Sequence, residues 1–320
     1  MFQDILPSTK KIVESSKYVF IDDDAIKKFC GSFTSRNFKS SGLGDTLQEC
    51  DVETSISLVC LFNCIDFCFW AAKGEEKWQI TIRREMFDGA SALFRALEEA
   101  VSNNVPLLDA DYLSEIDREK LQNILAGNRP IPLLDERVNC LREAGLVLLE
   151  RFDGEFINVF HTAKGDAVEL TNLFIQFFPS FDDYATLDGV RIGFHKRAQL
   201  NTDMINYRLG KKGRGNLTNH DKLTAFADYK VPQILRRFEI LKYAAGLSEK
   251  IDSLVEITAG SREEVEIRAA TIWAIEKIKQ HLLPENPDLT SARLDDYLWH
   301  AGQTKSPNDK PYHRTKTIYY

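Results

Sequence analysis

The sequence predicts a mainly α-helical protein with a small β hairpin near its N-terminal third. Two observations over its 320 residues support this class. Apolar residues recur with the helical period from about residue 88 onward, whereas a strand-like alternation of apolar and polar residues occurs near residue 80. Because no internal repeat or low-complexity linker divides the chain, we expect a single domain over residues 1–320.

The hairpin is expected between residues 65 and 84. The apolar run IDFCFWAA is followed by the polar segment KGEEK and then by WQITIRR. In the second run Trp78, Ile80 and Ile82 alternate with polar residues, which is typical of a half-buried strand. We expect the sheet to end there.

Helices are expected to form most of the remaining chain. Leu93, Leu97 and Val101 share one helical face after the break at Asp88 and Gly89. The same periodicity predicts further helices at residues 134–149, 168–178, 233–243, 263–281 and 292–301.

Composition excludes several classes of function. The chain carries 41 Lys and Arg against 48 Asp and Glu, and a net charge of −7 argues against a protein that coats nucleic acid. The longest apolar stretch, residues 57–72, contains Asn63 and Asp66 and is shorter than the ~20 residues of a membrane span. The first residues lack the apolar core of a signal peptide, so we expect a cytoplasmic protein with reduced thiols.

The cysteines do not predict a metal site. Cys60, Cys64 and Cys68 have the spacing of one helical face, but neither a His nor a fourth Cys lies nearby at zinc-site spacing. We interpret them as small buried apolar residues. The sequence also lacks a phosphate loop and a dinucleotide-binding fingerprint, so we expect no metal and no cofactor.

Several longer sequence motifs carry more specific information about the protein. They occur in order along the chain: NCLREAGLVLLERF (139–152), FHKRAQ (194–199), TAFADYKVPQIL (224–235), EVEIRAATIWAIE (264–276), LDDYLW (294–299) and YHRTKTIYY (312–320). Together they resemble the queuosine salvage protein family, the queuosine 5′-phosphate N-glycosidase/hydrolases, over roughly residues 5–320.

The resemblance implies a fold and an activity. The family has a mainly helical fold similar to helix-hairpin-helix DNA glycosylases, with a small β portion. Its members hydrolyse the N-glycosidic bond of queuosine 5′-monophosphate and release queuine, which a separate transglycosylase can insert into tRNA. The expected partner is therefore a small-molecule nucleotide, with no stable nucleic acid, no membrane and no obligate protein partner.

Asp228 matches the catalytic aspartate of the family. It precedes Pro232, which suits a first helical turn, so its carboxylate is expected near a positive helix N-terminus. Cleavage of an N-glycosidic bond passes through an oxocarbenium-like sugar, which a fixed carboxylate stabilises. Asp228 could stabilise this cation, attack it or orient water, and without the resemblance it would be interpreted as a helix cap.

Four further residues are assigned to the base. Asp295 matches the second aspartate of the family, and Thr290 and Ser291 precede it by about one helical turn. Queuine is a 7-deazaguanine, so it lacks the N7 that purine glycosylases can protonate, and polar groups must recognise its other edges. Ser291 could instead cap its helix. Phe226 is the candidate stacking platform, although an isolated Phe would be interpreted as core.

The 5′-phosphate is assigned to basic residues. His195, Lys196 and Arg197 are the first candidates, with His313 and Arg314 behind them, because guanidinium and ammonium groups suit a phosphate dianion. The alternative interpretation of each is a solvated charge on a helix.

One segment departs from the family pattern. Members commonly carry a base-contacting His in an N-terminal Leu-His segment, where this chain has Leu47-Gln48-Glu49 or Gly44-Asp45. Gln48 can replace one hydrogen bond of a neutral His but cannot become a cation.

Three functions follow as hypotheses. The leading one is a cofactor-independent hydrolase of queuosine 5′-monophosphate. A base-excision glycosylase acting on nucleic acid is disfavoured by the net charge of −7. A queuine-binding or carrier protein would keep the pocket without hydrolysis, and the presence of Asp228 argues against it.

Overall fold

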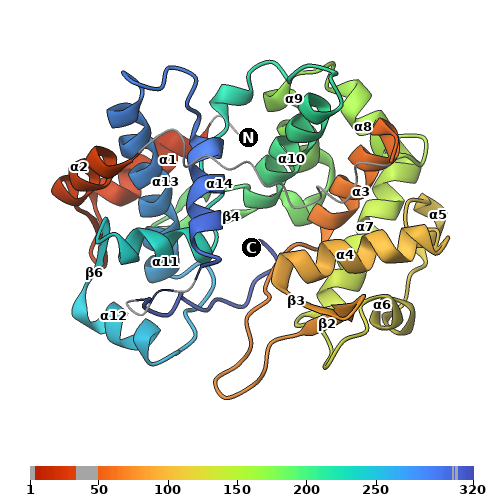
Figure 1. The fold of residues 1–320 in the computed structure, drawn as a ribbon, viewed down its shortest axis with the longest axis horizontal. Coiled ribbons are helices and arrows are strands. Elements are labelled where there is room, and N and C mark those ends of the chain that lie inside the picture. Colours follow the sequence, from red (N-terminus) through yellow and green to blue (C-terminus); the bar gives the residue numbers. More distant parts are fainter. Residues whose placement is uncertain (1–3, 34–49, 305, 307–308) are drawn as a thin grey trace. The chain divides into compact units, whose positions relative to one another are not determined.

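The computed structural model describes residues 4–33, 50–304, 306 and 309–320. The chain divides into two compact units. Unit 1 contains the described residues of Met1–Ser40, together with Asp183–Gln199 and Asp221–Lys316, and unit 2 contains those of Ser41–Asp182, with Leu200–His220 and Thr317–Tyr320. Both units are mainly helical with two-stranded antiparallel sheets, which confirms the predicted class (Figure 1).

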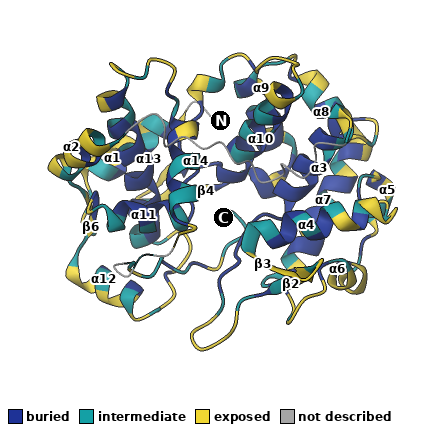
Figure 2. Cartoon of the chain, viewed as in Figure 1, coloured by how far each residue is buried: buried dark blue, intermediate teal, exposed yellow. Residues whose placement is uncertain are grey.

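The core of unit 1 is organised around helix α13 (Arg262–Leu282). Residues 264–272 of this helix are all buried (Figure 2). It packs against α1 (Ile5–Glu14), α2 (Asp23–Ser32), α11 (Lys230–Arg237) and α14 (Ser291–Ala301). Helix α12 (Ala245–Asp252) completes the unit.

Unit 1 also contains two small sheets. Strand β1 (Val19–Ile21) pairs antiparallel with β6 (Leu241–Tyr243), and β4 (Tyr184–Leu187) forms a hairpin with β5 (Val190–Gly193).

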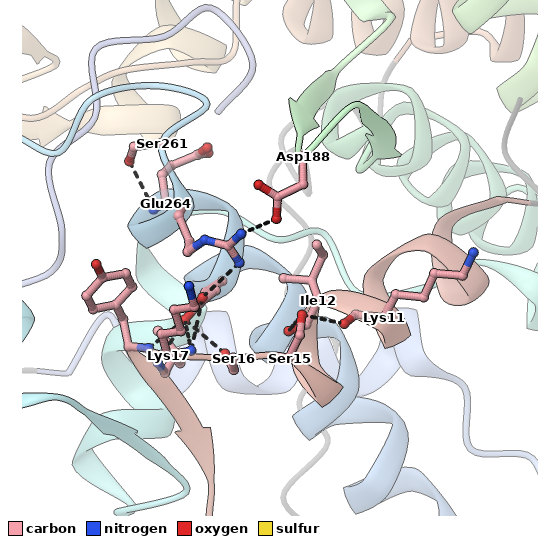
Figure 3. A network of polar contacts seen from close by, with 12 residues as sticks. Lys11, Ile12, Ser15, Ser16, Lys17, Asp188, Ser261 and Glu264 are labelled. Atoms are coloured by element: carbon pink, nitrogen blue, oxygen red, sulfur yellow. Dashed lines mark hydrogen bonds and ion pairs between the residues drawn. The ribbon is translucent and has the colours of Figure 1, made fainter.

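A buried carboxylate on α13 anchors the segment between α1 and β1. Glu266 accepts hydrogen bonds from the Ser16 hydroxyl (2.9 Å) and from the backbone N–H of Lys17 (3.0 Å) and Tyr18 (2.7 Å). Figure 3 shows this network beside the ion pair that Arg262 makes with Asp188. The N–H groups that follow α1 therefore have a charged acceptor although they lie outside a helix.

Unit 2 is an assembly of short and long helices around α7 (Leu134–Arg151). Helix α7 packs against α5 (Ala110–Ser114), α6 (Arg118–Ile124) and α3 (Val52–Cys64). The remaining elements are α4 (Gly89–Ser102), α8 (Phe156–Thr162), α9 (Ala167–Phe177), the short 3-10 helix η4 (Pro179–Phe181), the hairpin of β2 (Gln79–Ile82) and β3 (Glu85–Asp88), and most of α10 (Lys196–Lys211). A second 3-10 helix, η5 (His220–Lys222), follows α10 in the chain.

The predicted hairpin is partly wrong. The second strand exists as β2, but its partner is β3 rather than residues 65–72, which form no strand. The backbone of that run makes other hydrogen bonds. The buried guanidinium of Arg137 donates to the carbonyl oxygens of Ile65 and Phe67. Cys68 also has a positive φ of 48°, which is incompatible with a strand.

Other helix predictions hold with one exception. Helices α4, α7, α9, α13 and α14 occupy the predicted segments. The helix predicted at 233–243 is instead α11, which ends at Arg237, and Leu241 lies in β6. Glu239 has a φ of 58°, so the helix cannot continue through it. Strands also occur after residue 84, in β3, β4, β5 and β6, contrary to the prediction.

The apolar N-terminal stretch is core. Cys60 and Cys64 lie on α3, whereas Cys68 lies beyond its end, so the prediction of three thiols on one helical face is wrong for Cys68. Cys60, Cys64 and Cys68 are buried, as predicted, and Cys140 is buried too. In the ranges that the structure describes, no helix has the length and apolarity to cross a membrane.

Candidate active site

Asp228 caps helix α11 in unit 1. Its Oδ1 accepts hydrogen bonds from the backbone N–H of Lys230 (2.8 Å) and Val231 (2.9 Å), so the carboxylate lies at the helix N-terminus as predicted. The side chain is buried. Burial raises the pKa of Asp228, and the nearby Lys196 charge and the two amides oppose this rise. The result is a carboxylate that binds a proton more readily than an ordinary aspartate.

Asp295 on α14 is a second buried carboxyl group. Its Oδ1 accepts the backbone N–H of Phe226 at 2.9 Å. Burial raises the pKa of Asp295 well above its usual value, and the negative charge of Asp228 raises it further. Lys196 lowers the pKa of both carboxyl groups. Two acids and one ammonium group therefore lie within electrostatic reach of one another.

The loop that carries Asp228 is held at successive residues. The N–H of Phe226 is bound by Asp295, and the carbonyl oxygen of Ala227 accepts from Nε of Arg268 at 3.1 Å. The Phe226 side chain is buried, which a stacking platform and a core residue both require. The backbone of the loop therefore has little freedom.

The first phosphate candidates are not solvated. His195, Lys196 and Arg197 are 2%, 7% and 1% exposed, so the alternative of solvated helix charges is wrong for them. Lys196 and Arg197 are the first two residues of helix α10, and His195, which precedes them, has a left-handed φ of 47°. The N–H of Lys196 donates to Oδ2 of Asp183 at 3.0 Å.

The second phosphate candidates differ from each other in charge. Burial, assisted by the positive charge of Arg268, lowers the pKa of His313 to about 3. His313 is therefore neutral near pH 7 and offers a phosphate a hydrogen bond rather than a charge. Arg314 is half-buried, and its carbonyl oxygen accepts the N–H of Ile257 at 2.7 Å.

Thr290 and Ser291 are engaged in holding α14. Thr290 is the N-cap and accepts the N–H of Arg293 at 3.2 Å. Ser291, which was the alternative cap, is the first residue of the helix instead. Its hydroxyl donates to Glu276 on α13 and accepts from Nζ of Lys279 at 2.7 Å.

The sequence did not reveal two charged residues beside this loop. Asp183 and Arg268 form a buried ion pair between the chain just before β4 and the middle of α13. Arg268 lies within the word EVEIRAATIWAIE, where Glu264 and Glu266 also interrupt the apolar pattern, so no periodicity marks it. Nothing in the local sequence marks Asp183 either.

Gln48 and its neighbours, the segment that departs from the family pattern, lie outside the described residues. Within the described part of the chain, no cluster of three or more His, Cys, Asp and Glu residues is arranged to hold a metal ion.

Comparison with known proteins identifies relatives over the whole chain. A family model described as queuosine salvage protein matches residues 47–320. A protein of Sphaerobacter thermophilus named queuosine 5′-phosphate N-glycosylase/hydrolase is 39% identical over 317 residues, covering 99% of this chain and 97% of the relative. Proteins of the same name from Bos taurus and Schizosaccharomyces pombe are 31% and 26% identical, covering 98% and 78% of this chain and 97% and 75% of those relatives. The chain therefore belongs to the queuosine salvage protein family.

Proposed function

We propose that this protein hydrolyses the N-glycosidic bond of queuosine 5′-monophosphate and releases queuine. The observation that carries the proposal is the buried pair of Asp228 and Asp295 with Lys196 in electrostatic reach, in a chain of this family. A nucleotide is the small-molecule substrate that the names of the relatives indicate.

Asp228 is the proposed catalytic carboxylate. The bond between C1′ and the base nitrogen breaks, its electron pair leaves with the base, and positive charge develops on the sugar. A carboxylate held by the N–H groups of Lys230 and Val231 is already oriented, so little reorganisation is needed to stabilise that charge. Water then supplies hydroxide to C1′ and a proton to the base, which yields ribose 5-phosphate and queuine.

Asp295 is the proposed contact to the departing base. A carboxyl group whose pKa lies well above its usual value retains its proton more readily and can donate a hydrogen bond as charge develops on the base. The adjacent residue in space, Phe226, is the proposed stacking platform, since its N–H is bound to the Asp295 carboxyl group. Thr290 and Ser291 remain proposed base contacts, although their hydroxyl groups already bind protein atoms.

Lys196 and Arg197 are the proposed phosphate ligands. Their position at the start of α10 supports this assignment, because Lys196 lies within electrostatic reach of Asp228 and Asp295, and ammonium and guanidinium groups suit a phosphate dianion. His195 is a further proposed phosphate ligand. Arg314 and the neutral His313 are the candidates of second rank.

The remaining proposals concern the molecule as a whole. We propose a fold similar to helix-hairpin-helix DNA glycosylases, which the mainly helical structure supports at the level of class. A single functional domain over residues 1–320 and a cytoplasmic location stay predictions.

Incubation with three substrates tests the function. Purified protein is mixed with queuosine 5′-monophosphate, queuosine and guanosine 5′-monophosphate, and the released base is measured by mass spectrometry. We expect queuine from the monophosphate and no guanine. Binding of queuine without turnover would indicate a carrier. In a separate incubation with an oligonucleotide, release of a base would indicate a base-excision enzyme.

A further inference from the structure

We propose that Arg268 and Asp183 are positioning residues that hold the Asp228 loop and the start of α10 in a fixed relation. Binding of the 5′-phosphate at α10 then sets the glycosidic bond against Asp228. This inference rests on the proposed function and adds to it two residues that touch neither the sugar nor the base.

Arg268 joins the two segments through three hydrogen bonds. Its Nη1 and Nη2 donate to Oδ1 and Oδ2 of Asp183 at 2.8 and 2.5 Å, and its Nε donates to the carbonyl oxygen of Ala227 at 3.1 Å. Ala227 is the residue before Asp228. One planar guanidinium thus binds a carboxylate with one edge and the catalytic loop with Nε, a geometry that an ammonium group cannot reproduce.

Asp183 extends the connection to the phosphate segment. Its Oδ2 accepts the N–H of Lys196 at 3.0 Å, and its backbone oxygen accepts the N–H groups of Phe194 (2.9 Å) and His195 (3.1 Å). His195 has a left-handed φ of 47°, an unfavourable conformation for a residue with a side chain. Asp183 therefore fixes the direction in which α10 begins.

The surroundings keep the pair rigid. The side chains of Arg268 and Asp183 are 3% and 2% exposed. The guanidinium lies 4.0 Å from the centre of the Phe194 ring, and Oε1 of Glu264 lies 3.6 Å from Nη1. An ion pair buried in this way is costly to assemble and has little freedom to rearrange.

Rigidity matters because the phosphate does not react. Its binding energy accelerates cleavage only when the phosphate site and the catalytic carboxylate keep a fixed distance. If Lys196 and Asp228 could move independently, the phosphate would still bind but would no longer orient the sugar. Loss of the ion pair should therefore reduce kcat/KM for the monophosphate more than kcat/KM for the free nucleoside.

The test compares two substrates in three variants. Arg268→Lys keeps the positive charge but loses the planar set of donors that binds Asp183 and Ala227. Asp183→Asn keeps the shape of the side chain but loses its negative charge. Glu266→Gln is the matched control, since Glu266 is a buried carboxylate on the same helix that binds residues 16–19 instead. For each protein, kcat/KM is measured with queuosine 5′-monophosphate and with queuosine. The ratio of the two values does not depend on the folded fraction.

We expect the ratio to fall by about tenfold or more in Arg268→Lys and Asp183→Asn, and by less than about threefold in Glu266→Gln. The loss for the monophosphate should appear mainly in kcat. An equal loss for both substrates, or an equal fall in the control, would overturn the proposal.

Amide hydrogen exchange supplies a readout that needs no turnover. Exchange at Lys196 and at residues 226–228 should accelerate in both variants and remain unchanged in Glu266→Gln. Unchanged exchange in Arg268→Lys and Asp183→Asn would also overturn the proposal. Absence of queuine release by the unmodified protein would reject the proposed function instead, and the exchange experiment would still decide whether the pair holds the two segments.

Discussion

At the scale of single residues, the Asp228 carboxylate is subject to opposing effects. Burial favours its neutral form, whereas the Lys196 charge and the N–H groups of Lys230 and Val231 favour its ionised form. Burial dominates, so the pKa of Asp228 is raised. A positive helix N-terminus by itself favours the ionised form. The sequence shows where the helix starts but not how deeply the carboxylate is buried, so the rise in pKa could not be predicted from it.

Replacement of Asp228 by Asn should abolish most of the activity. The Asn oxygen can still accept from the N–H of Lys230 and Val231, so the cap persists while the charge facing the sugar is lost. We expect single-turnover cleavage to slow by about 10²–10³-fold, with queuine binding retained.

A matched control for this substitution is Asp109→Asn. Oδ1 of Asp109 caps α5 with the same pattern, accepting from Asp111 (2.8 Å) and Tyr112 (3.2 Å). Its activity should equal that of the unmodified protein. A rate for Asp228→Asn within about threefold of the unmodified protein would reject Asp228 as the catalytic carboxylate.

Asp295 makes stability depend on pH. Its raised pKa means that the folded protein binds this proton more tightly than the unfolded chain, so its contribution is fully present below the ordinary aspartate pKa of ~3.9 and is lost as pH rises through the folded pKa. Asp295→Asn removes this loss and can still accept the Phe226 N–H. The stability of the variant relative to the unmodified protein should therefore increase with rising pH in urea titrations.

The control is Asp135→Asn, because the Asp135 side chain is 70% exposed. The stability difference for Asp295→Asn should change more with pH than the difference for this control. A pH-independent difference for Asp295→Asn would show that the buried carboxyl group is not a source of the pH dependence.

At the scale of elements, α14 is attached to α13 by a polar cluster. Ser291 binds Glu276 and Lys279, and Lys279 also pairs with Glu276 at 2.6 Å. This cluster lies one turn before Asp295 on α14. The orientation of the second carboxyl group therefore depends on how one helix is anchored to another.

Ser291→Ala should test whether this hydroxyl anchors the helix or contacts the base. As an anchor, its loss removes one of the donors to the buried Glu276 carboxylate, which keeps its ion pair with Lys279, and lowers the free energy of unfolding by about 1–3 kcal/mol, with KM unchanged. A strongly raised KM with unchanged stability would support the base contact predicted from sequence. Thr290→Ala, which removes only the cap, should cost about 1 kcal/mol.

At the scale of the whole molecule, each unit has a buried arginine that binds segments outside the helices and strands. In unit 1 this residue is Arg268, which binds Asp183 and the carbonyl oxygen of Ala227. In unit 2 this residue is Arg137, which is fully buried and also donates to the carbonyl oxygen of Pro132 at 3.0 Å. Its guanidinium lies 4.4 Å from the centre of the Phe67 ring. The segment that sequence predicts as a strand is thus held by a side chain instead of a neighbouring strand.

Arg137→Lys should destabilise the protein strongly. A lysine keeps the charge but cannot reach several carbonyl oxygens at once, so buried acceptors lose their donors and the free energy of unfolding falls by about 2–5 kcal/mol. Arg118→Lys, at a side chain that is 53% exposed, should change it by less than about 1 kcal/mol. Equal denaturation midpoints for the two variants would contradict this role of Arg137.

Local sequence determined most of the helices, and the resemblance to a known family supplied the candidate carboxylates. Apolar periodicity is a local property, so α4, α7, α9, α13 and α14 could be predicted, and an ordered set of motifs singled out Asp228 and Asp295. Tertiary structure alone decided the pairings between distant segments, such as β1 with β6 and Asp183 with Arg268, which are 85 residues apart. It also decided that His313 is neutral and that residues 65–72 form no strand. The physical reason is that burial, strand partners and ion pairs depend on which parts of the chain meet in space, and a local pattern of residues carries no such information.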